Sequence, residues 1–344
     1  MNALGSLSFI VVTHNSLRTI SDCLSSIQNQ SIGPTEIVVV DNNSIDGTPD
    51  AVKDEFPELK VIRNESNLGY GGGNNIGLEH CHGDLVAFVN PDVALHREWA
   101  ALLLNHMRLE QECGAAEGKL LLAQDPHRIN CRGSHVNVLG FGCATGYGLL
   151  DDGDDAVRDV TYCSGAAFVV RRDAFMRAGQ FDASYFLYHE DVDLGLRLQS
   201  CGWKLHCVAS ALAYHHHKGT LTPEKTYFLE RNRWVTLMKN MTFQYFVRAG
   251  PLLMVSELGL LLYMMAKGLG RSKAKAMIDA LRRSQTLTMT GVRRQPSQPD
   301  RRGSVILTDD FPPLVRGRET LTAIARRIQT AYCNSFFAEP VTLR

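Results

Sequence analysis

The 344-residue sequence lacks three features that would assign it to a specialised class of protein. Its formal net charge is zero, with 36 basic and 36 acidic side chains, so no overall field favours nucleic acid. Its nine cysteines include no Cys-x-x-Cys pair, which argues against a disulfide framework and against a zinc ribbon. The N-terminus has no basic segment followed by an apolar one, so no signal peptide is expected. Together these absences favour a protein that works in a reducing cytosol.

What is present is the composition of an ordinary folded protein, with 44% hydrophobic and 21% charged residues. The length allows one large domain or two ordinary ones. The charge is unevenly distributed, because residues 266–344 carry 15 Lys and Arg against 6 Asp and Glu. Residues 151–159 form an acidic patch that is expected to be a surface loop.

The first 111 residues alternate between strand and helix patterns. Leu7–Thr13 is a β-branched apolar run, typical of a strand buried on both faces, and further strands are predicted at 36–40, 60–63 and 85–89. Helical patterns lie between and after them, at 17–27, 48–55, 67–80 and 97–111. This order predicts an α/β fold with a Rossmann-like, mostly parallel sheet flanked by helices. Ligands of such sheets bind beyond the carboxyl ends of the strands.

Polar side chains follow three of these strands. Thr13 and Asn15 offer hydrogen bonds to a heterocycle, and Asp41 can accept hydrogen bonds from a base or a ribose. Asp92, in Asn-Pro-Asp, can hold a divalent cation together with diphosphate oxygens. A helix cap and a turn-forming aspartate are the alternatives for Asn15 and Asp92. The glycine-rich run 67–77 can bring amides to phosphate, although a structural role is the more common one for such a run.

Three carboxylates stand where an aromatic run gives way to a helical pattern. These are Glu190, Asp191 and Asp193, and the helix is expected to stop near Gly202. Acidic residues in a first helical turn are often caps. A carboxylate partly desolvated by aromatic neighbours can instead act as a general base, because burial raises its proton affinity.

Downstream, the pattern is less regular. Residues 114–159 are predicted to be irregular, followed by strands near 166–170 and up to about 213, and by a helix over 223–240. His215 heads a run of three histidines, of which at most one or two can face a single metal. Residues 249–266 contain one charge and are flanked by basic residues. We expect a helix in the membrane interface, with a buried core helix and a true span as alternatives.

In their order, these motifs resemble the inverting nucleotide-sugar glycosyltransferases of family 2, which have the GT-A fold. The resemblance covers roughly residues 6–240 and is nearest to the rhamnosyltransferase-like branch, which has Asn-Pro-Asp where relatives have Asp-x-Asp. It implies a catalytic domain at 1–240, a helical membrane-interface region at 241–294 and an extension at 295–344. It also implies inverting sugar transfer, with L-rhamnose from dTDP-rhamnose as the suggested donor, in polysaccharide or lipopolysaccharide O-antigen synthesis.

The resemblance also assigns roles to individual residues. Asp191 is expected to be the catalytic base, supported by Glu190, and Mg²⁺ or Mn²⁺ is expected to bind Asp92 and His215. The nucleotide-sugar would contact Thr13, Asn15, Asp41, Asn67, Gly72 and Asn74. The expected partners are this donor, a glycan or lipid-linked acceptor and a membrane surface, with the protein cytoplasmic and peripheral on the plasma membrane. The alternatives are a non-catalytic assembly partner and a nucleotidyltransferase that acts on sugar phosphates.

Overall fold

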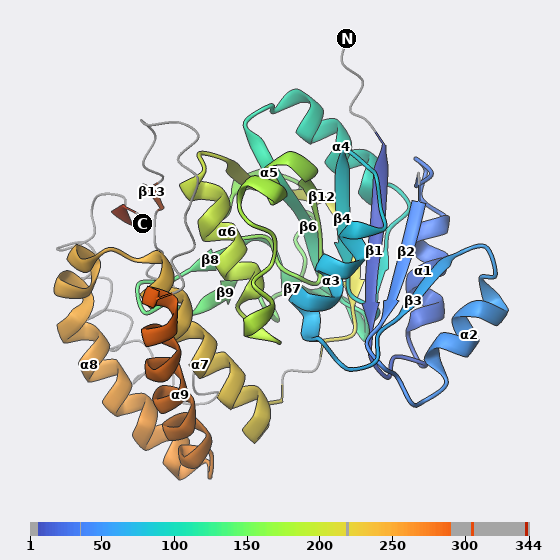
Figure 1. Ribbon diagram of the computed structural model, residues 1–344. Coiled ribbons are helices and arrows are strands. Elements are labelled where there is room, and N and C mark those ends of the chain that lie inside the picture. Colours follow the sequence, from blue (N-terminus) through green and yellow to red (C-terminus); the bar gives the residue numbers. More distant parts are fainter. Residues whose placement is uncertain (1–5, 35, 218–219, 290–303, 306–340, 343–344) are drawn as a thin grey trace. The chain divides into compact units, whose positions relative to one another are not determined.

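The computed structural model describes residues 6–34, 36–217, 220–289, 304–305 and 341–342 (Figure 1). The chain divides into two compact units. The first comprises Met1–Ser134, Ala144–Leu198 and Trp203–Lys218, and the second comprises His135–Cys143, Gln199–Gly202 and Gly219–Arg344. The predicted division at 240 and 294 stays a prediction, and the structure groups the helix over 223–240 with the second unit.

A ten-stranded sheet forms the centre of the first unit. Its order is β10-β12-β6-β11-β4-β1-β2-β3, with β5 paired to β12 and β7 to β6. The pairs of β1 with β2 and β4, of β2 with β3 and of β6 with β12 are parallel, whereas β11 runs antiparallel to β4 and β6. The strands are β1 (Leu7–Thr13), β2 (Glu36–Asp41), β3 (Lys60–Arg63), β4 (Leu85–Val89), β5 (Val93–Leu95), β6 (Cys113–Leu122), β7 (Asp125–Cys131), β10 (Val157–Asp159), β11 (Ala167–Arg171) and β12 (Lys204–His215).

Helices cover this sheet, which has a hydrophobic core on each side. Alternation along β1 sends Phe9 and Val11 into one core, with Trp99, and Ile10 into the other, with Phe88. The predicted α/β class is therefore confirmed, as is the prediction that the first strand is buried on both faces. The helices are α1 (Ile20–Gln28), α2 (Thr48–Glu55), α3 (Gly69–Glu79), α4 (Trp99–Leu109), α5 (Arg172–Arg177), α6 (Glu190–Ser200) and the short 3₁₀ helix η1 (Ala183–Tyr185).

The prediction that residues 114–159 are irregular is wrong. This region contains β6, whose ten residues are all buried in the middle of the sheet, and β7 and β10. The strand was hidden because it is built from small residues and carries Glu117 and Lys119 inside, so no alternation marks it. Two further strands, β8 (Ser134–Val136) and β9 (Gly142–Ala144), form a separate two-stranded sheet.

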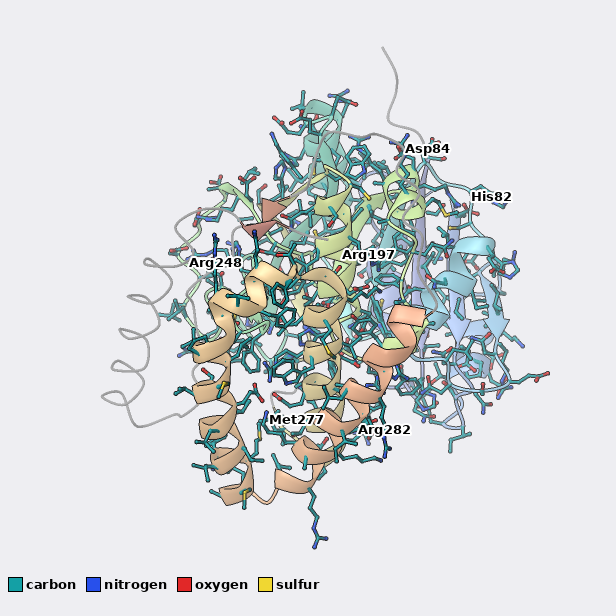
Figure 2. The ribbon with its side chains drawn as sticks, turned by 60° about the vertical axis from the view of Figure 1, so that its left-hand side comes forward. His82, Asp84, Arg197, Arg248, Met277 and Arg282 are labelled. Atoms are coloured by element: carbon teal, nitrogen blue, oxygen red, sulfur yellow. The ribbon has the colours of Figure 1, made fainter. Side chains whose placement is uncertain are left out.

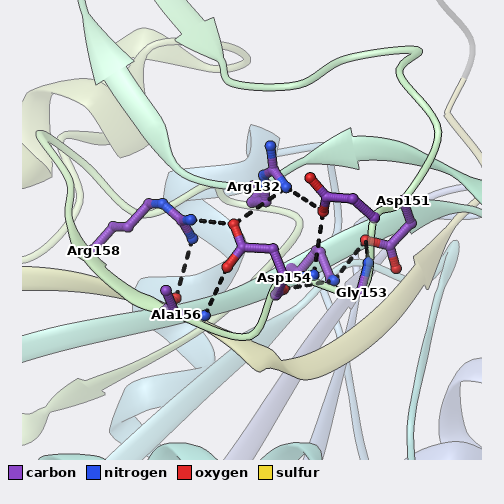
Figure 3. A network of polar contacts seen from close by, with 8 residues as sticks. Arg132, Asp151, Gly153, Asp154, Ala156 and Arg158 are labelled. Carbon is purple, nitrogen blue, oxygen red and sulfur yellow. Dashed lines mark hydrogen bonds and ion pairs between the residues drawn. The ribbon is translucent and has the colours of Figure 1, made fainter.

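The acidic segment at 151–159 is held by basic side chains (Figure 3). Lys119, buried in β6, contacts Asp151 at 2.7 Å. Arg132 contacts Asp152 at 2.6 Å, and both Arg132 and Arg158 contact Asp154. The patch is therefore largely neutralised locally, and it offers little field for a cationic partner.

The described part of the second unit consists chiefly of three helices, α7 (Pro223–Asn240), α8 (Phe243–Ala266) and α9 (Gly270–Met289), and of the pair β13 (Ser304–Val305) and β14 (Val341–Thr342). Figure 2 shows Arg248 on α8, and Met277 and Arg282 on α9. A buried ionic network joins the helices. Arg233 contacts Glu230 at 2.9 Å and also contacts Glu257, while Lys273 contacts Glu230 at 2.6 Å and Glu257 at 2.8 Å. The predicted extension at 295–344 lies, apart from β13 and β14, outside the described residues.

Candidate active site

The start of α6 is placed by an unusual turn. Phe186, Tyr188 and His189 all have positive φ, at 67°, 67° and 70°, although none is glycine. Each such residue costs about 1–3 kcal/mol of strain, and such strain gathers at functional sites. The carbonyl of Phe186 accepts a hydrogen bond from the amide of Tyr70 at 2.8 Å, which ties the turn to α3. The turn delivers Glu190 and Asp191 as the first residues of α6.

Asp191 is half-buried, and two backbone amides hold its carboxylate. Gly165 N–H donates to Oδ2 at 3.0 Å, and Val192 N–H donates to Oδ1 at 2.8 Å. Burial raises the pKa of Asp191 despite these hydrogen bonds. A carboxylate with fixed orientation and raised proton affinity has the properties of a general base.

Glu190 is more deeply buried than Asp191, with 6% of its surface exposed. Its Oε2 atom has no hydrogen-bond partner among the residues that the structure describes. Burial, and then the charge of Asp191, hold the pKa of Glu190 well above its usual range. The pKa of Tyr70 is raised by burial and by the same two carboxylates, and its hydroxyl donates to Gly165 O at 2.8 Å. Burial therefore raises the proton affinity of both carboxyl groups, and that of Glu190 the further of the two.

A third carboxylate, Glu117 in the middle of β6, was missed by the sequence analysis. It is 1% exposed and accepts hydrogen bonds from Ser164 N–H at 2.7 Å and Ser134 Oγ at 3.0 Å. Burial raises its pKa to about 8, and the charge of Asp191 adds to this. The only signal was a charged residue within a run of small apolar ones, in a segment that was expected to be irregular.

The register of β5 brings Asp92 and His215 together. After Asn-Pro-Asp the chain turns back, and β5 pairs antiparallel to β12 with Val93 opposite His215. Asp92 Oδ1 then lies 3.6 Å from His215 Nε2. His215 Nδ1 lies 2.9 Å from Asn130 Oδ1, which can only accept, so Nδ1 carries the hydrogen. When the ring is neutral, the lone pair on Nε2 therefore faces Asp92.

This donor set fits the expected cation. Two neighbouring ligands of an octahedral Mg²⁺ or Mn²⁺ lie about 3 Å apart, close to the observed separation. Asn130 supplies the outer hydrogen bond that orients a metal-binding imidazole. Of the two histidines that follow, His216 is exposed, whereas the ring of His217 lies 5.4 Å from that of His215. The three consecutive histidines therefore do not all face one site.

Two backbone hydrogen bonds link the segments that carry Asp92 and Asp191. The amide of Asn90 donates to Ala166 O at 2.8 Å, and the neighbouring amide of Gly165 donates to Asp191. Asp92 follows two residues after Asn90. These segments, whose aspartates are 99 positions apart in sequence, therefore meet at one edge of the sheet.

The residues expected at the nucleotide lie at the ends of β1 and β2. Thr13 pairs in register with Asp41, and its Oγ1 has no hydrogen-bond partner among the described residues. Asp41 is fully buried, accepts from Ser44 N–H at 3.1 Å and lies 3.6 Å from Arg63. Asn15 has φ of 53°, and its side-chain oxygen accepts from Ile45 N–H at 2.9 Å. Asp41 and Asn15 thus shape the turns beside Thr13.

The glycine-rich run is mostly helix α3. A Cβ on Gly73 or Gly77 would approach side chains of β1 to 2.7 Å and 2.5 Å, so these glycines let α3 pack directly on the sheet. The side chains expected at the nucleotide-sugar have local partners here. Asn67 Oδ1 accepts from Gly69 N–H at 2.9 Å, and Asn74, 1% exposed, donates to Tyr70 O at 3.0 Å. Gly72 packs against Leu68.

The sheet, with its polar residues gathered at one edge, has the architecture of a GT-A glycosyltransferase. Residues 8–117 match the model of glycosyl transferase family 2, and residues 92–277 match that of glycosyl transferase family group 2. The chain therefore belongs to the family 2 glycosyltransferases.

Among its relatives is the N-acetylglucosaminyl-diphospho-decaprenol L-rhamnosyltransferase of Mycobacterium tuberculosis H37Rv, 31% identical over 61% of this chain and 76% of the relative. The rhamnosyltransferase WbbL of Escherichia coli K12 is 28% identical over 52% of this chain and 70% of the relative. These names place the chain near the rhamnosyltransferase-like branch.

Two solved structures share the fold. The mannosyltransferase PcManGT of Pyrobaculum calidifontis, in complex with GDP-Man and Mn²⁺, has a TM-score of 0.52 at 17% identity, over 97% of this chain and 88% of that chain. GalNAc-T7, with UDP, GalNAc and Mn²⁺, has a TM-score of 0.57 at 16% identity. The match spans 71% of this chain and about half, 49%, of GalNAc-T7.

Proposed function

We propose that this glycosyltransferase moves L-rhamnose from dTDP-rhamnose, with inversion, to a lipid-linked N-acetylglucosaminyl diphosphate in the synthesis of a cell-surface polysaccharide. The observation that carries the reaction type is a pair of backbone hydrogen bonds, from Gly165 N–H to Asp191 and from Asn90 N–H to Ala166 O, which hold together the segments that carry Asp191 and Asp92. The proposed base and the proposed metal ligand thus come from segments that meet at one sheet edge. The sugar and acceptor are those of the relative from Mycobacterium tuberculosis.

In an inverting transfer, the acceptor hydroxyl attacks the anomeric carbon from the face opposite the leaving nucleoside diphosphate. Asp191 accepts the hydroxyl proton as the new bond forms. Glu190, whose pKa is held well above its usual range by burial, is proposed to stay protonated and so to keep a second negative charge away from Asp191. Asp92 and His215 would hold Mg²⁺ or Mn²⁺, which offsets the charge that develops on the diphosphate. We propose that Thr13, Asn15 and Asp41 bind the nucleoside and that Asn67, Gly72 and Asn74 support the donor site at the start of α3.

A donor screen tests this proposal. The full chain with Mn²⁺ is melted in the presence of dTDP-, UDP- and GDP-sugars, because a ligand that binds the folded state raises the melting temperature. We expect dTDP-rhamnose to give the largest shift, and Asp92→Ala to abolish its metal dependence. A larger shift with another sugar nucleotide would replace the proposed donor. Turnover in Asp191→Asn within about tenfold of wild type would remove the proposed base, and no turnover in wild type would favour the assembly-partner alternative.

The second unit supports a membrane-bound acceptor. The exposed face of α8 is apolar along most of its length, since more than half of the surface is exposed at Phe243, Val247, Met254, Val255, Leu258, Leu262 and Met265. Exposed basic residues flank this face, at Arg248, Lys267, Arg271 and Lys275. An apolar face with basic ends fits an anionic bilayer surface.

The alternatives to an interfacial helix fit less well. Only 22% of the apolar window of α8 is buried, which does not suit a core helix. The helix is long and apolar enough to span a membrane by composition, but Glu257 faces inward and is paired with Arg233 and Lys273. A span would carry this network into lipid, at a cost of several kcal/mol. We therefore propose a cytoplasmic protein bound peripherally to the plasma membrane.

Vesicle flotation tests the membrane proposal. We expect the full chain to float with vesicles that contain phosphatidylglycerol, and to float less when Leu258→Glu and Leu262→Glu are combined. Leu150→Glu, at another exposed leucine, is the matched control and should float as wild type does. Equal flotation of the double variant would contradict the role of α8.

A further inference from the structure

A second cluster of possible metal ligands lies away from the sheet edge that carries Asp92 and His215. His106 is in the last turn of α4, Cys113 is the first residue of β6 and His206 is near the start of β12. One ligand atom from each of the three lies within 4.8 Å of the others. His215 is the last residue of β12, nine positions after His206, so up to about 30 Å of strand separates the two sites.

The hydrogen bonds of His206 leave a lone pair that points into the cluster. Its Nε2 atom lies 3.2 Å from Asp159 Oδ1, a carboxylate that can only accept when ionised, so Nε2 carries a hydrogen. In the neutral ring, Nδ1 is then the acceptor, and it lies 2.7 Å from Nε2 of His106. A carboxylate behind an imidazole is the outer-shell arrangement that orients metal-binding histidines.

We propose that His106 Nε2, His206 Nδ1 and Cys113 Sγ bind one Zn²⁺ ion, or a cation of the same class, and that this ion links α4 to β6 and β12. Two imidazole nitrogens and a thiolate suit Zn²⁺, whereas Mg²⁺ and Mn²⁺ prefer oxygen. In a tetrahedral site the nitrogens lie about 3.3 Å apart and each lies about 3.6 Å from sulfur, so the three side chains need to move by only about 1 Å.

The protons of the cluster can be accounted for on binding. The Cys113 thiol, which donates to Ala115 O at 3.2 Å, loses its proton to solvent and becomes the thiolate ligand. His106 moves its hydrogen from Nε2 to Nδ1 and stays neutral. Three protein ligands leave the fourth position to water. Because the ligands come from one helix and two strands, no short sequence motif announces the site.

Cobalt substitution tests the site directly. The full chain is freed of metal with a chelator and titrated with Co²⁺, whose thiolate complexes show a charge-transfer absorption in the near ultraviolet. We expect this absorption to saturate at one Co²⁺ per chain, and to be lost in Cys113→Ser and in His106→Gln. His106 lies on a helix surface, so the second variant is expected to fold even if the first does not. Zn²⁺ should raise the melting temperature by about 5 °C at 100 times its dissociation constant.

Two controls separate this site from others. Cys201→Ser removes an exposed thiol that could bind Co²⁺ adventitiously, and Asp92→Asn removes the carboxylate of the proposed donor-metal site, which has no thiolate. Both variants should keep the full absorption. Absence of the absorption in wild type, its loss in Cys201→Ser, or its persistence in folded Cys113→Ser would each overturn the proposal. None of these readouts depends on sugar transfer, so the proposed activity and this site can fail separately.

Discussion

Two adjacent acids at the start of α6 are expected to respond differently to the same chemical change. Asp191→Asn removes the carboxylate that is proposed to accept a proton, whereas Glu190→Gln replaces a carboxyl group whose burial favours the protonated form. Burial and the charge of Asp191 raise the pKa of Glu190 well above its usual range, so a neutral amide is a near match for it. We expect Asp191→Asn to slow transfer by about 10²- to 10⁴-fold and Glu190→Gln to retain it within about tenfold.

The size of the first effect follows from the role of the base. General-base catalysis contributes about 10²- to 10⁴-fold, which corresponds to about 3–5 kcal/mol of barrier. The free energy of unfolding should change less than the reaction barrier does. Asparagine has one side-chain oxygen, so it can accept the hydrogen bond of Gly165 N–H or that of Val192 N–H but not both. The backbone amide left without a partner costs about 1–3 kcal/mol of stability. Removal of a partly buried charge offsets part of that loss.

The assay is initial-rate transfer from the donor identified in the screen, with melting temperatures measured in parallel. Because burial raises the pKa of Asp191, the acidic decline of kcat/KM in wild type should lie above the range of an ordinary aspartate. Glu190→Gln should keep an acidic decline, since Asp191 remains the titrating base. Comparable losses in both variants, or a loss confined to Glu190→Gln, would refute the assignment of the base to Asp191.

Three further predictions concern stability. Burial raises the pKa of Glu117 from 4.5 to about 8, so the folded state binds more protons than the unfolded state in this range. Its contribution to the free energy of unfolding should therefore fall as pH rises from about 5 to 8, by up to about 1.4 kcal/mol per pH unit. In urea unfolding, Glu117→Gln should show a shallower fall than wild type, with the remaining slope coming from Glu190 and Asp191, whose pKa values are also raised. Gly77→Ala should destabilise the protein by about 1–3 kcal/mol, because the added methyl group overpacks the contact with β1. At Gly259 an added methyl group meets no atom within 4 Å, so Gly259→Ala should be neutral or stabilising in the same urea unfolding. Glu257→Gln leaves two buried cations against Glu230 alone and should cost about 3 kcal/mol, whereas Glu224→Gln on the exposed start of α7 should cost less than about 0.5 kcal/mol.

The parts of the fold that the sequence predicts well are those with strong periodicity. The strand at Leu7–Thr13, the strand at Lys60–Arg63 and the helix at 48–55 match the structure at both ends. β6 could not be predicted because small residues, a buried glutamate and a buried lysine give no alternation, although burial on both faces of a sheet requires none. Its antiparallel neighbour β11 shows that pairing direction also depends on contacts distant in sequence.

The candidate site follows the same division. Asp92, Asp191 and His215 stand beside recognisable turns and strand ends. The sequence alone was therefore enough to name them as candidate site residues. Glu117 lies near Asp191 only because of the register between β6 and β11. Asn130 belongs to the site only because its side chain hydrogen-bonds to His215 from a different strand. Neither relation has a local signal in the sequence. The glycines of α3 could be identified, but only the structure shows that they allow close packing on β1.

The central claim is that one sheet edge combines a carboxylate base with a bound diphosphate and inverts the anomeric centre. The most direct measurement is the anomeric configuration of the transferred rhamnose, determined by NMR on the product formed from dTDP-rhamnose and a lipid-linked N-acetylglucosaminyl diphosphate. We predict the configuration opposite to that of the donor, formed by the wild-type protein and about 10²- to 10⁴-fold more slowly by Asp191→Asn. A product that retains the donor configuration would contradict direct displacement with Asp191 as the base.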